Sequence, residues 1–174
     1  NTIDGYYKAG DTLVVTVAFS EIVAVTGVSQ LVLETGINNA VIFYTGGSGT
    51  TTLNFNYIIE SGHNNSDLDY VNTNSLSLIN GLIRDVAGND ANLTLLEPGS
   101  SGSLSANKAL IVDAIIPTVS SVSSTTLDSI YNIGDTLVIT VNFPETMVVD
   151  TSGGKPQLSL ETGSANAVVD YTSG

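Results

Sequence analysis

Apolar and polar residues alternate with a period of two along most of the chain, as in strands that bury one face. The two clearest runs are 13–19 and 53–59, in which every second residue is Leu, Val, Phe, Tyr or Ile. Shorter runs surround positions 31–33 and 41–43, and no stretch of useful length has the 3.6-residue period of a helix. The residues predicted to face the core are Leu13, Val15, Val17, Phe19, Leu31, Leu33, Val41, Phe43, Leu53, Phe55, Tyr57 and Ile59.

Turn-forming residues separate these strands. Asn80-Gly81 stands between two apolar runs, a pattern that predicts a tight type I′ hairpin. Further turns are expected at 87–89 and 98–102, and the run at 108–113 is expected to be a last strand. Roughly seven short strands without an intervening helix favour an all-β fold, specifically an immunoglobulin-like Greek-key β-sandwich.

Much of the chain is present twice. Residues 4–19 and 128–143 are identical at 10 of 16 positions, at an offset of 124. Residues 30–47 and 157–174 are identical at 12 of 18, at an offset of 127, and the three extra residues fall in the loop 150–155. Such repetition indicates β-sandwich units used in tandem, whose task is set by length and surface more than by one catalytic pocket.

The repeat predicts three parts. Residues 1–113 form one immunoglobulin-like repeat without a counterpart of 117–124, the expected first strand; 114–117 is a linker; and 118–174 is the first part of a second, incomplete repeat. We therefore expect a piece of a longer chain, or a subunit that its neighbours complete. A half sandwich exposes apolar surface and unpaired edges, so 118–174 is not expected to fold stably alone.

The segments 7–21, 44–50, 67–70, 84–89 and 111–119 together resemble the bacterial immunoglobulin-like tandem repeats of large extracellular adhesins and surface fibre proteins. The most specific pieces are Asp-x-Ala-Gly-Asn within 84–89 and the Val-Asp-x-x-x-Pro junction within 111–119, although the two isoleucines make this junction unusually apolar. The resemblance implies an extracellular rod, at the cell surface or in a secreted fibre, with units often stiffened by calcium at their junctions.

Composition narrows the choice of partners. Seventeen acidic residues face four basic ones, a formal net charge of -13. That charge argues against nucleic acid, which is bound largely through Lys and Arg, and against docking on anionic lipid. No apolar run approaches the roughly 20 residues that span a bilayer, so membrane insertion is not expected. Cysteine is absent, which excludes disulfides and thiolate chemistry.

Calcium is the best candidate ligand, because it takes hard oxygen donors from carboxylates, amides and carbonyls. Asp67 and Asp69 lie two apart and would share one face of a strand; Asp85 and Asn89 flank a glycine turn; Asp113 ends the last strand before the junction. The alternative is that Asp and Asn are simply turn-forming, solubilising residues. The predicted ligands are Asp67, Asp69, Asp85, Asn89, Asp113 and Asp128.

Nothing in the chain indicates an enzyme. The single histidine, His63, lies between Gly and Asn and is expected to be a solvated loop residue. No nucleophile-elbow motif leads from a strand into a helix. Glu21 and Glu34 recur in the second copy as Glu145 and Glu161, which favours a structural role over a catalytic carboxylate pair.

The expected function is therefore that of a stiff spacer in an extracellular bacterial adhesin or fibre. Its partners are neighbouring repeats or copies of itself, and host or surface glycans or proteins through other parts of the chain. One alternative is a self-assembling filament subunit, in which a neighbour supplies the missing strand. Another is a carbohydrate-binding module with a tyrosine face; its candidate residues are Tyr6, Tyr7, Tyr44, Tyr57 and Tyr70.

Overall fold

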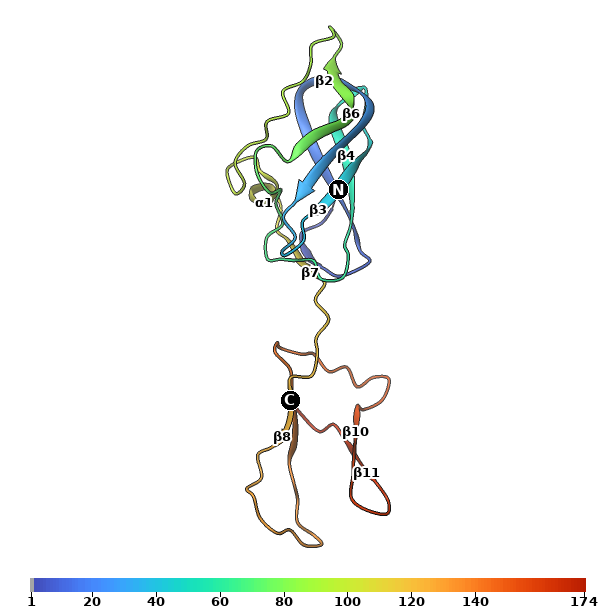
Figure 1. Ribbon diagram of the computed structural model, residues 1–174, viewed down its shortest axis with the longest axis vertical. Helices are drawn as coiled ribbons and strands as arrows, with labels where there is room; N and C mark the ends of the chain where they lie inside the picture. Colours follow the sequence, from blue (N-terminus) through green and yellow to red (C-terminus); the bar gives the residue numbers. More distant parts are fainter. Residues whose placement is uncertain (1) are drawn as a thin grey trace. The chain divides into compact units, whose positions relative to one another are not determined.

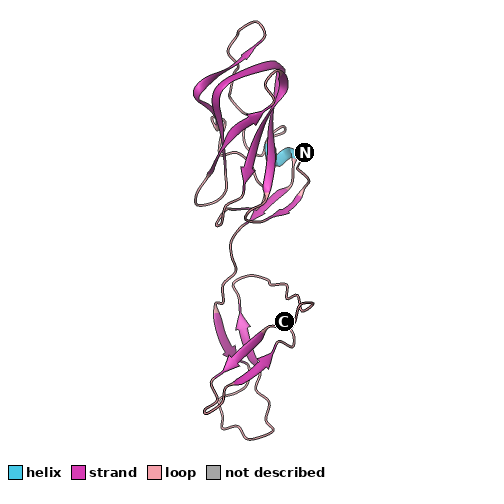
Figure 2. Ribbon diagram, turned by 90° about the vertical axis from the view of Figure 1, so that its right-hand side faces the viewer, coloured by secondary structure: helices cyan, strands magenta, loops and turns pink. Residues whose placement is uncertain are grey.

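The computed structural model describes residues 2–174 and divides them into two compact units, one ending at Ile116 and the other spanning Pro117–Gly174 (Figure 1). This boundary falls within the segment 114–117 that the sequence assigns to a linker. Strands make up nearly all the regular structure of the described residues, and the one helix, α1, spans only Leu104–Asn107 (Figure 2). The prediction of an all-β protein is confirmed.

One long strand organises the first unit. Strand β2 spans Thr12–Leu33 without interruption, where the alternation predicted separate strands. Its first part pairs antiparallel with β4 (Thr50–Ile58), and its second part pairs antiparallel with β6 (Leu76–Asp85). Its last four residues also pair with β3 (Ala40–Gly46). A register shift between Ala18 and Val23 marks where β2 passes from β4 to β6.

The main sheet therefore curls back on itself. Its strand order is β3-β4-β2-β6, and an additional pairing joins β3 to β2 (Figure 1). Strand β3 contacts β4 through Tyr44 and Gly46 at its C-terminal end and β2 through the residues before them. Closing a sheet in this way encloses one face, which becomes the core.

A small second sheet completes the first unit. Its central strand is β7 (Leu110–Asp113), which pairs in parallel with β1 (Gly5–Tyr7) and antiparallel with β5 (Asn64–Asn65). Leu110 and Val112 of β7 are buried, so this sheet contributes to the same core as the curled sheet.

The core confirms the predicted inward positions on β2 and β4, but the inward face predicted for β3 is wrong. Ala40 and Ile42 are buried, whereas Val41 and Phe43 are about half exposed, at 48% and 49%. The register explains the shift, because Ile42 lies opposite the buried Leu31. Residues directly opposite each other in an antiparallel pair share one face of the sheet.

The hairpin predicted at Asn80-Gly81 is wrong, because β6 continues straight through these residues. Gly81 lies opposite Gly27 of β2. A Cβ on Gly27 would lie 1.9 Å from the Asn80 carbonyl oxygen, and one on Gly81 would lie 2.2 Å from that of Thr26. The glycine pair therefore allows two backbones to approach closely, a role that leaves the same sequence signal as a turn.

The second unit contains two separate two-stranded ladders. Strand β8 (Ser121–Ser124) pairs with β9 (Ile139–Asn142), and β10 (Gln157–Leu160) pairs with β11 (Ala167–Asp170). The β10–β11 register repeats the β2–β3 register of the first unit at the sequence offset of 127. Among the described residues, every buried hydrophobic side chain belongs to the first unit.

Candidate functional site

Asp69 is the most highly connected polar residue of the first unit. It is 7% exposed, and its Oδ1 accepts hydrogen bonds from the backbone N–H groups of Tyr70, at 2.8 Å, and Leu104, at 3.3 Å. Its Oδ2 accepts from the Gly99 N–H at 3.0 Å and the Ser105 hydroxyl at 2.7 Å. One carboxylate thus holds the segment 99–105 against the end of the preceding loop.

Burial raises the pKa of the Asp69 carboxyl, but the hydrogen bonds from Ser105, Gly99 and Tyr70 more than offset this effect. The pKa therefore lies below its ordinary value of 3.8, and the group is a carboxylate at neutral pH. Four donors already occupy its two oxygens, so Asp69 is better suited to ordering the loop than to binding a cation.

Asp85 and Asn89 come together as the sequence predicts. The backbone N–H of Asn89 donates to Asp85 Oδ1 at 2.8 Å, and its side-chain Nδ2 donates to Oδ2 at 2.7 Å. These hydrogen bonds lower the pKa of Asp85, and the one from the Asn89 side chain has the largest effect. Both residues line a cavity of about 260 Å³ between the middle of β2 and the C-terminal end of β6, together with Glu21 and Asp90.

This cavity offers carboxylate and amide oxygens, the donors that calcium takes. One of its carboxylates already has a cationic partner, because Arg84 Nε lies 2.6 Å from Asp90 Oδ1. Glu21, at its rim, is one of the acidic residues that recur in the second copy.

The other predicted ligands are exposed and come from three different segments of the chain. Asp67 precedes the buried Leu68 in an irregular segment, so it does not share a strand face with Asp69. Asp113 ends β7 in the first unit, and its Oδ1 accepts the Ile115 N–H at 3.3 Å. Asp128 lies in the second unit. Over residues 2–174, no three His, Cys, Asp or Glu side chains converge to hold a metal.

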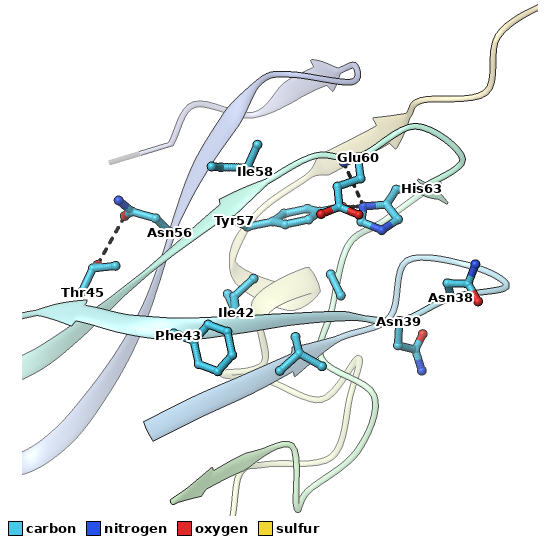
Figure 3. A pocket seen from close by; sticks show the side chains of 12 residues that line it. Asn38, Asn39, Ile42, Phe43, Thr45, Asn56, Tyr57, Ile58, Glu60 and His63 are labelled. Carbon is cyan, nitrogen blue, oxygen red and sulfur yellow. Dashed lines mark hydrogen bonds between the residues drawn. The ribbon is translucent and has the colours of Figure 1, made fainter. Parts of the chain in front are cut away.

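His63 is buried, contrary to the prediction of a solvated loop residue. It is 8% exposed, and its Nδ1 lies 2.8 Å from the Tyr57 hydroxyl and accepts the Glu60 N–H at 3.2 Å (Figure 3). Because Nδ1 accepts a hydrogen bond from a backbone N–H, the ring proton of a neutral His63 lies on Nε2. The signal available in the sequence was the inward-facing Tyr57, whose hydroxyl needs a buried partner.

Tyr57 and His63 form one wall of a cavity of about 430 Å³ beside β3 and β4 (Figure 3). Val41, Phe43 and Ile58 line the same cavity and remain 48–62% exposed. Phe43 is replaced by Asp170 in the second copy. Val41 is retained as Val168, so the second copy repeats this apolar surface only in part.

The tyrosines do not all remain available to a sugar. Tyr57 is fully buried, and Tyr70 is 7% exposed with its hydroxyl donating to the Leu96 carbonyl at 2.7 Å. The hydroxyl of Tyr44 accepts the Ser48 N–H at 2.9 Å. Tyr6 is 81% exposed. Burial raises the pKa of Tyr57 well above its ordinary value, with a further contribution from Glu60.

Comparison with known proteins adds no relative: no family model, no curated protein and no solved structure matches the chain. No helix among the described residues is long and apolar enough to cross a membrane.

Proposed function

We propose that the chain is a structural repeat of an extracellular bacterial adhesin or fibre, built from immunoglobulin-like Greek-key sandwiches in tandem. Each repeat contributes length, and cations bound by acidic loops contribute stiffness. The fold in this proposal is finer than the all-β class established above, and it rests on the sequence resemblance together with the curled sheet.

The observation that carries the proposal is that both copies make the same local contacts. In the first unit the Gly36 N–H donates to Glu34 Oε1 at 3.0 Å, and in the second the Gly163 N–H donates to Glu161 Oε1 at 2.8 Å. These recurring glutamates order a turn, which is what a repeated structural block requires. An active site needed only once would leave no reason to preserve them in both copies.

Calcium remains part of the proposal at two places. One is the cavity lined by Glu21, Asp85 and Asn89, and the other is the junction that begins after Asp113. A cation in either place would offset part of the net charge of -13. At a junction it would also limit bending between neighbouring units.

Thermal unfolding of the full chain in calcium, and then in excess chelator, tests this part. A ligand that binds only the native state raises the midpoint by mass action. We expect a calcium-dependent rise that is reduced in Asp85→Ala and Asp113→Ala and retained in the matched control Asp170→Ala. An unchanged midpoint in all four proteins would mean that the acidic residues only solubilise the chain.

The carbohydrate-binding alternative has less support, because two of its five tyrosines are buried. The filament alternative is favoured by a specific feature of β2, namely the backbone groups along one of its edges.

A further inference from the structure

We propose that the edge of β2 at Val15–Ala18, the acceptor edge, binds the strand Ser121–Ser124 of a second copy of this chain. This strand, β8, is the donor strand. The proposal deepens the structural function proposed above and rests on it only for the biological setting.

The acceptor edge carries backbone groups that no strand satisfies. Thr12–Ala18 pairs with β4 along one edge only, and over residues 2–174 no strand pairs with the other. Val14 shows where that other edge lies, because its N–H donates to Thr2 Oγ1 at 2.9 Å and its carbonyl accepts from the same hydroxyl at 3.2 Å. Alternate residues of a strand direct their N–H and C=O to the same edge, so Thr16 and Ala18 present theirs there too.

The second unit contains the same edge in a paired state. The Val138 N–H donates to Thr126 Oγ1 at 3.0 Å, and the Ser124 hydroxyl donates to the Val138 carbonyl at 2.7 Å. Val138 and Thr126 correspond to Val14 and Thr2 at the offset of 124. Thr2 and Thr126 therefore bind the equivalent valine at the same edge in the two copies.

Beyond this point the second unit shows which residues fill the edge. Strand β8 pairs antiparallel with β9, so that Ser121 lies opposite Asn142 and Ser124 opposite Ile139. Transferred by the repeat offset, the donor strand would run from opposite Ala18 to opposite Val15. The edge thus has a defined occupant, direction and register.

Side-chain chemistry agrees with this register. Val122 lies opposite Val141 in the second unit, and Val141 corresponds to Val17. Val17 is only partly buried and packs against the core of the first unit. Val122 is 55% exposed on its own ladder. Pairing with β2 would place these two valines side by side, where β-branched cross-strand pairs are favourable.

The donor strand is expected to pair more stably with β2 of a second copy than with β9. All four of its residues are exposed, and the β8–β9 ladder has only two strands. A two-stranded ladder is marginally stable in water. The acceptor edge belongs to a strand whose Leu13 and Val15 are buried in a packed core, so a strand added there extends a stable sheet.

Each chain carries one donor strand and one acceptor edge at different places. Such a contact is heterologous, and successive copies add head to tail into open chains unless the rotation closes a ring. A filament is the expected product.

The test measures assembly and the two edge amides in the same full-length samples. Sedimentation from about 1 µM to about 1 mM is expected to show mass rising with concentration. Amide exchange at Thr16 and Ala18 is expected to slow at least about tenfold on assembly, while Val15 and Val17, already paired with β4, serve as internal controls. A mass that stays monomeric overturns the proposal, as does assembly that leaves Thr16 and Ala18 exchanging at the monomer rate.

Two variants test the donor and the occupant. Val122→Asp should abolish assembly, whereas Val168→Asp, at a position 60% exposed on β11, should assemble normally. Attaching a copy of residues 117–124 directly before Asn1 should fill the edge within the chain, giving a monomer with protected Thr16 and Ala18. If this extended chain assembles like the original, the acceptor edge has been wrongly placed.

The calcium-dependent unfolding midpoint does not require strand exchange. Absence of assembly would therefore leave the proposed spacer function intact. An unfolding midpoint that does not respond to calcium would leave the proposal of strand exchange intact.

Discussion

The two units share two similar stretches of sequence and the local geometry of these stretches, yet the buried core of the described residues lies in the first unit alone. In the first, the Lys8 N–H donates to Asp11 Oδ2 at 2.9 Å; in the second, the Asn132 N–H donates to Asp135 Oδ2 at 2.7 Å. The turn that precedes the first long alternation is therefore the same in both. Contacts within a few residues depend on local sequence, and the repeat preserves them.

Burial separates the units. Leu13 is fully buried, whereas its counterpart Leu137 is 49% exposed. In the first unit β4 pairs beside Leu13, and β6 and β7 supply further core residues. Residues 117–174 contain no counterpart of these three strands. Alternation therefore gives a strand one apolar face, and strands distant in sequence decide whether that face is buried.

The largest expected effect comes from truncating this pair of leucines. Leu13→Ala should lower the free energy of unfolding of the first unit by about 2–5 kcal/mol, because it empties a packed site. Leu137→Ala should change the stability by no more than about 0.5 kcal/mol, as expected of an exposed site. Urea unfolding followed by tyrosine fluorescence checks both. Equal losses would mean that the second unit has a core after all.

The glycine contact between β2 and β6 should be the next most sensitive. Gly27→Ala places a Cβ 1.9 Å from a backbone oxygen at a φ of +74°, and we expect a loss of about 2 kcal/mol or more. Gly154, between β9 and β10 of the second unit, has a φ of +126° but no atom within 4 Å of a Cβ. Gly154→Ala therefore measures the cost of a positive φ without a close contact. Similar thermal midpoints for the two variants would contradict the proposed role of Gly27.

Replacing the buried Asp69 should lower the stability more than replacing an exposed aspartate. Asp69→Asn puts an amide N–H₂ among four donors, which should cost about 1–3 kcal/mol at neutral pH. Because the folded-state pKa lies below 3.8, the charge contributes stability above that value, and this stability is lost as the pH falls toward the folded pKa.

The measurement is the unfolding midpoint of both proteins between neutral pH and about pH 2. The difference between wild type and Asp69→Asn should shrink as the pH falls. A constant difference would show that the carboxylate charge is not what holds the loop. The control Asp67→Asn, at an exposed position, should leave the neutral-pH midpoint unchanged.

The smallest effect concerns the buried Tyr57. Tyr57→Phe removes the hydroxyl that meets His63 and should cost about 1 kcal/mol. The raised pKa of Tyr57 keeps it neutral in the folded protein, so its contribution is complete below pH 10 and is lost as the pH rises further. Wild type should therefore lose more stability than Tyr57→Phe above pH 10. Tyr6→Phe, at an exposed site, should behave like wild type there.

Parts of the candidate site could be read from the sequence, and others could not. The Asp85–Asn89 turn was predictable, because both residues flank a glycine within five positions. The burial of His63 was missed, because its one signal in the sequence is indirect: the inward-facing Tyr57 needs a buried partner for its hydroxyl, and His63 meets it across a turn. The hydrogen bonds of Asp69 to Gly99 and Ser105 join residues 30 and 36 positions apart and leave no periodic signal.

The all-β class, the repeat, the Asp85–Asn89 turn and the inward faces of β2 and β4 could be predicted from the sequence, because they follow from period-two alternation and local hydrogen bonding. Three features could be known from the tertiary contacts alone: 12–33 is one strand, Gly27 and Gly81 face each other, and β3 turns Ile42 inward and Phe43 outward. Each of these depends on which distant strand pairs alongside and in what register, and register has no signature within a single strand.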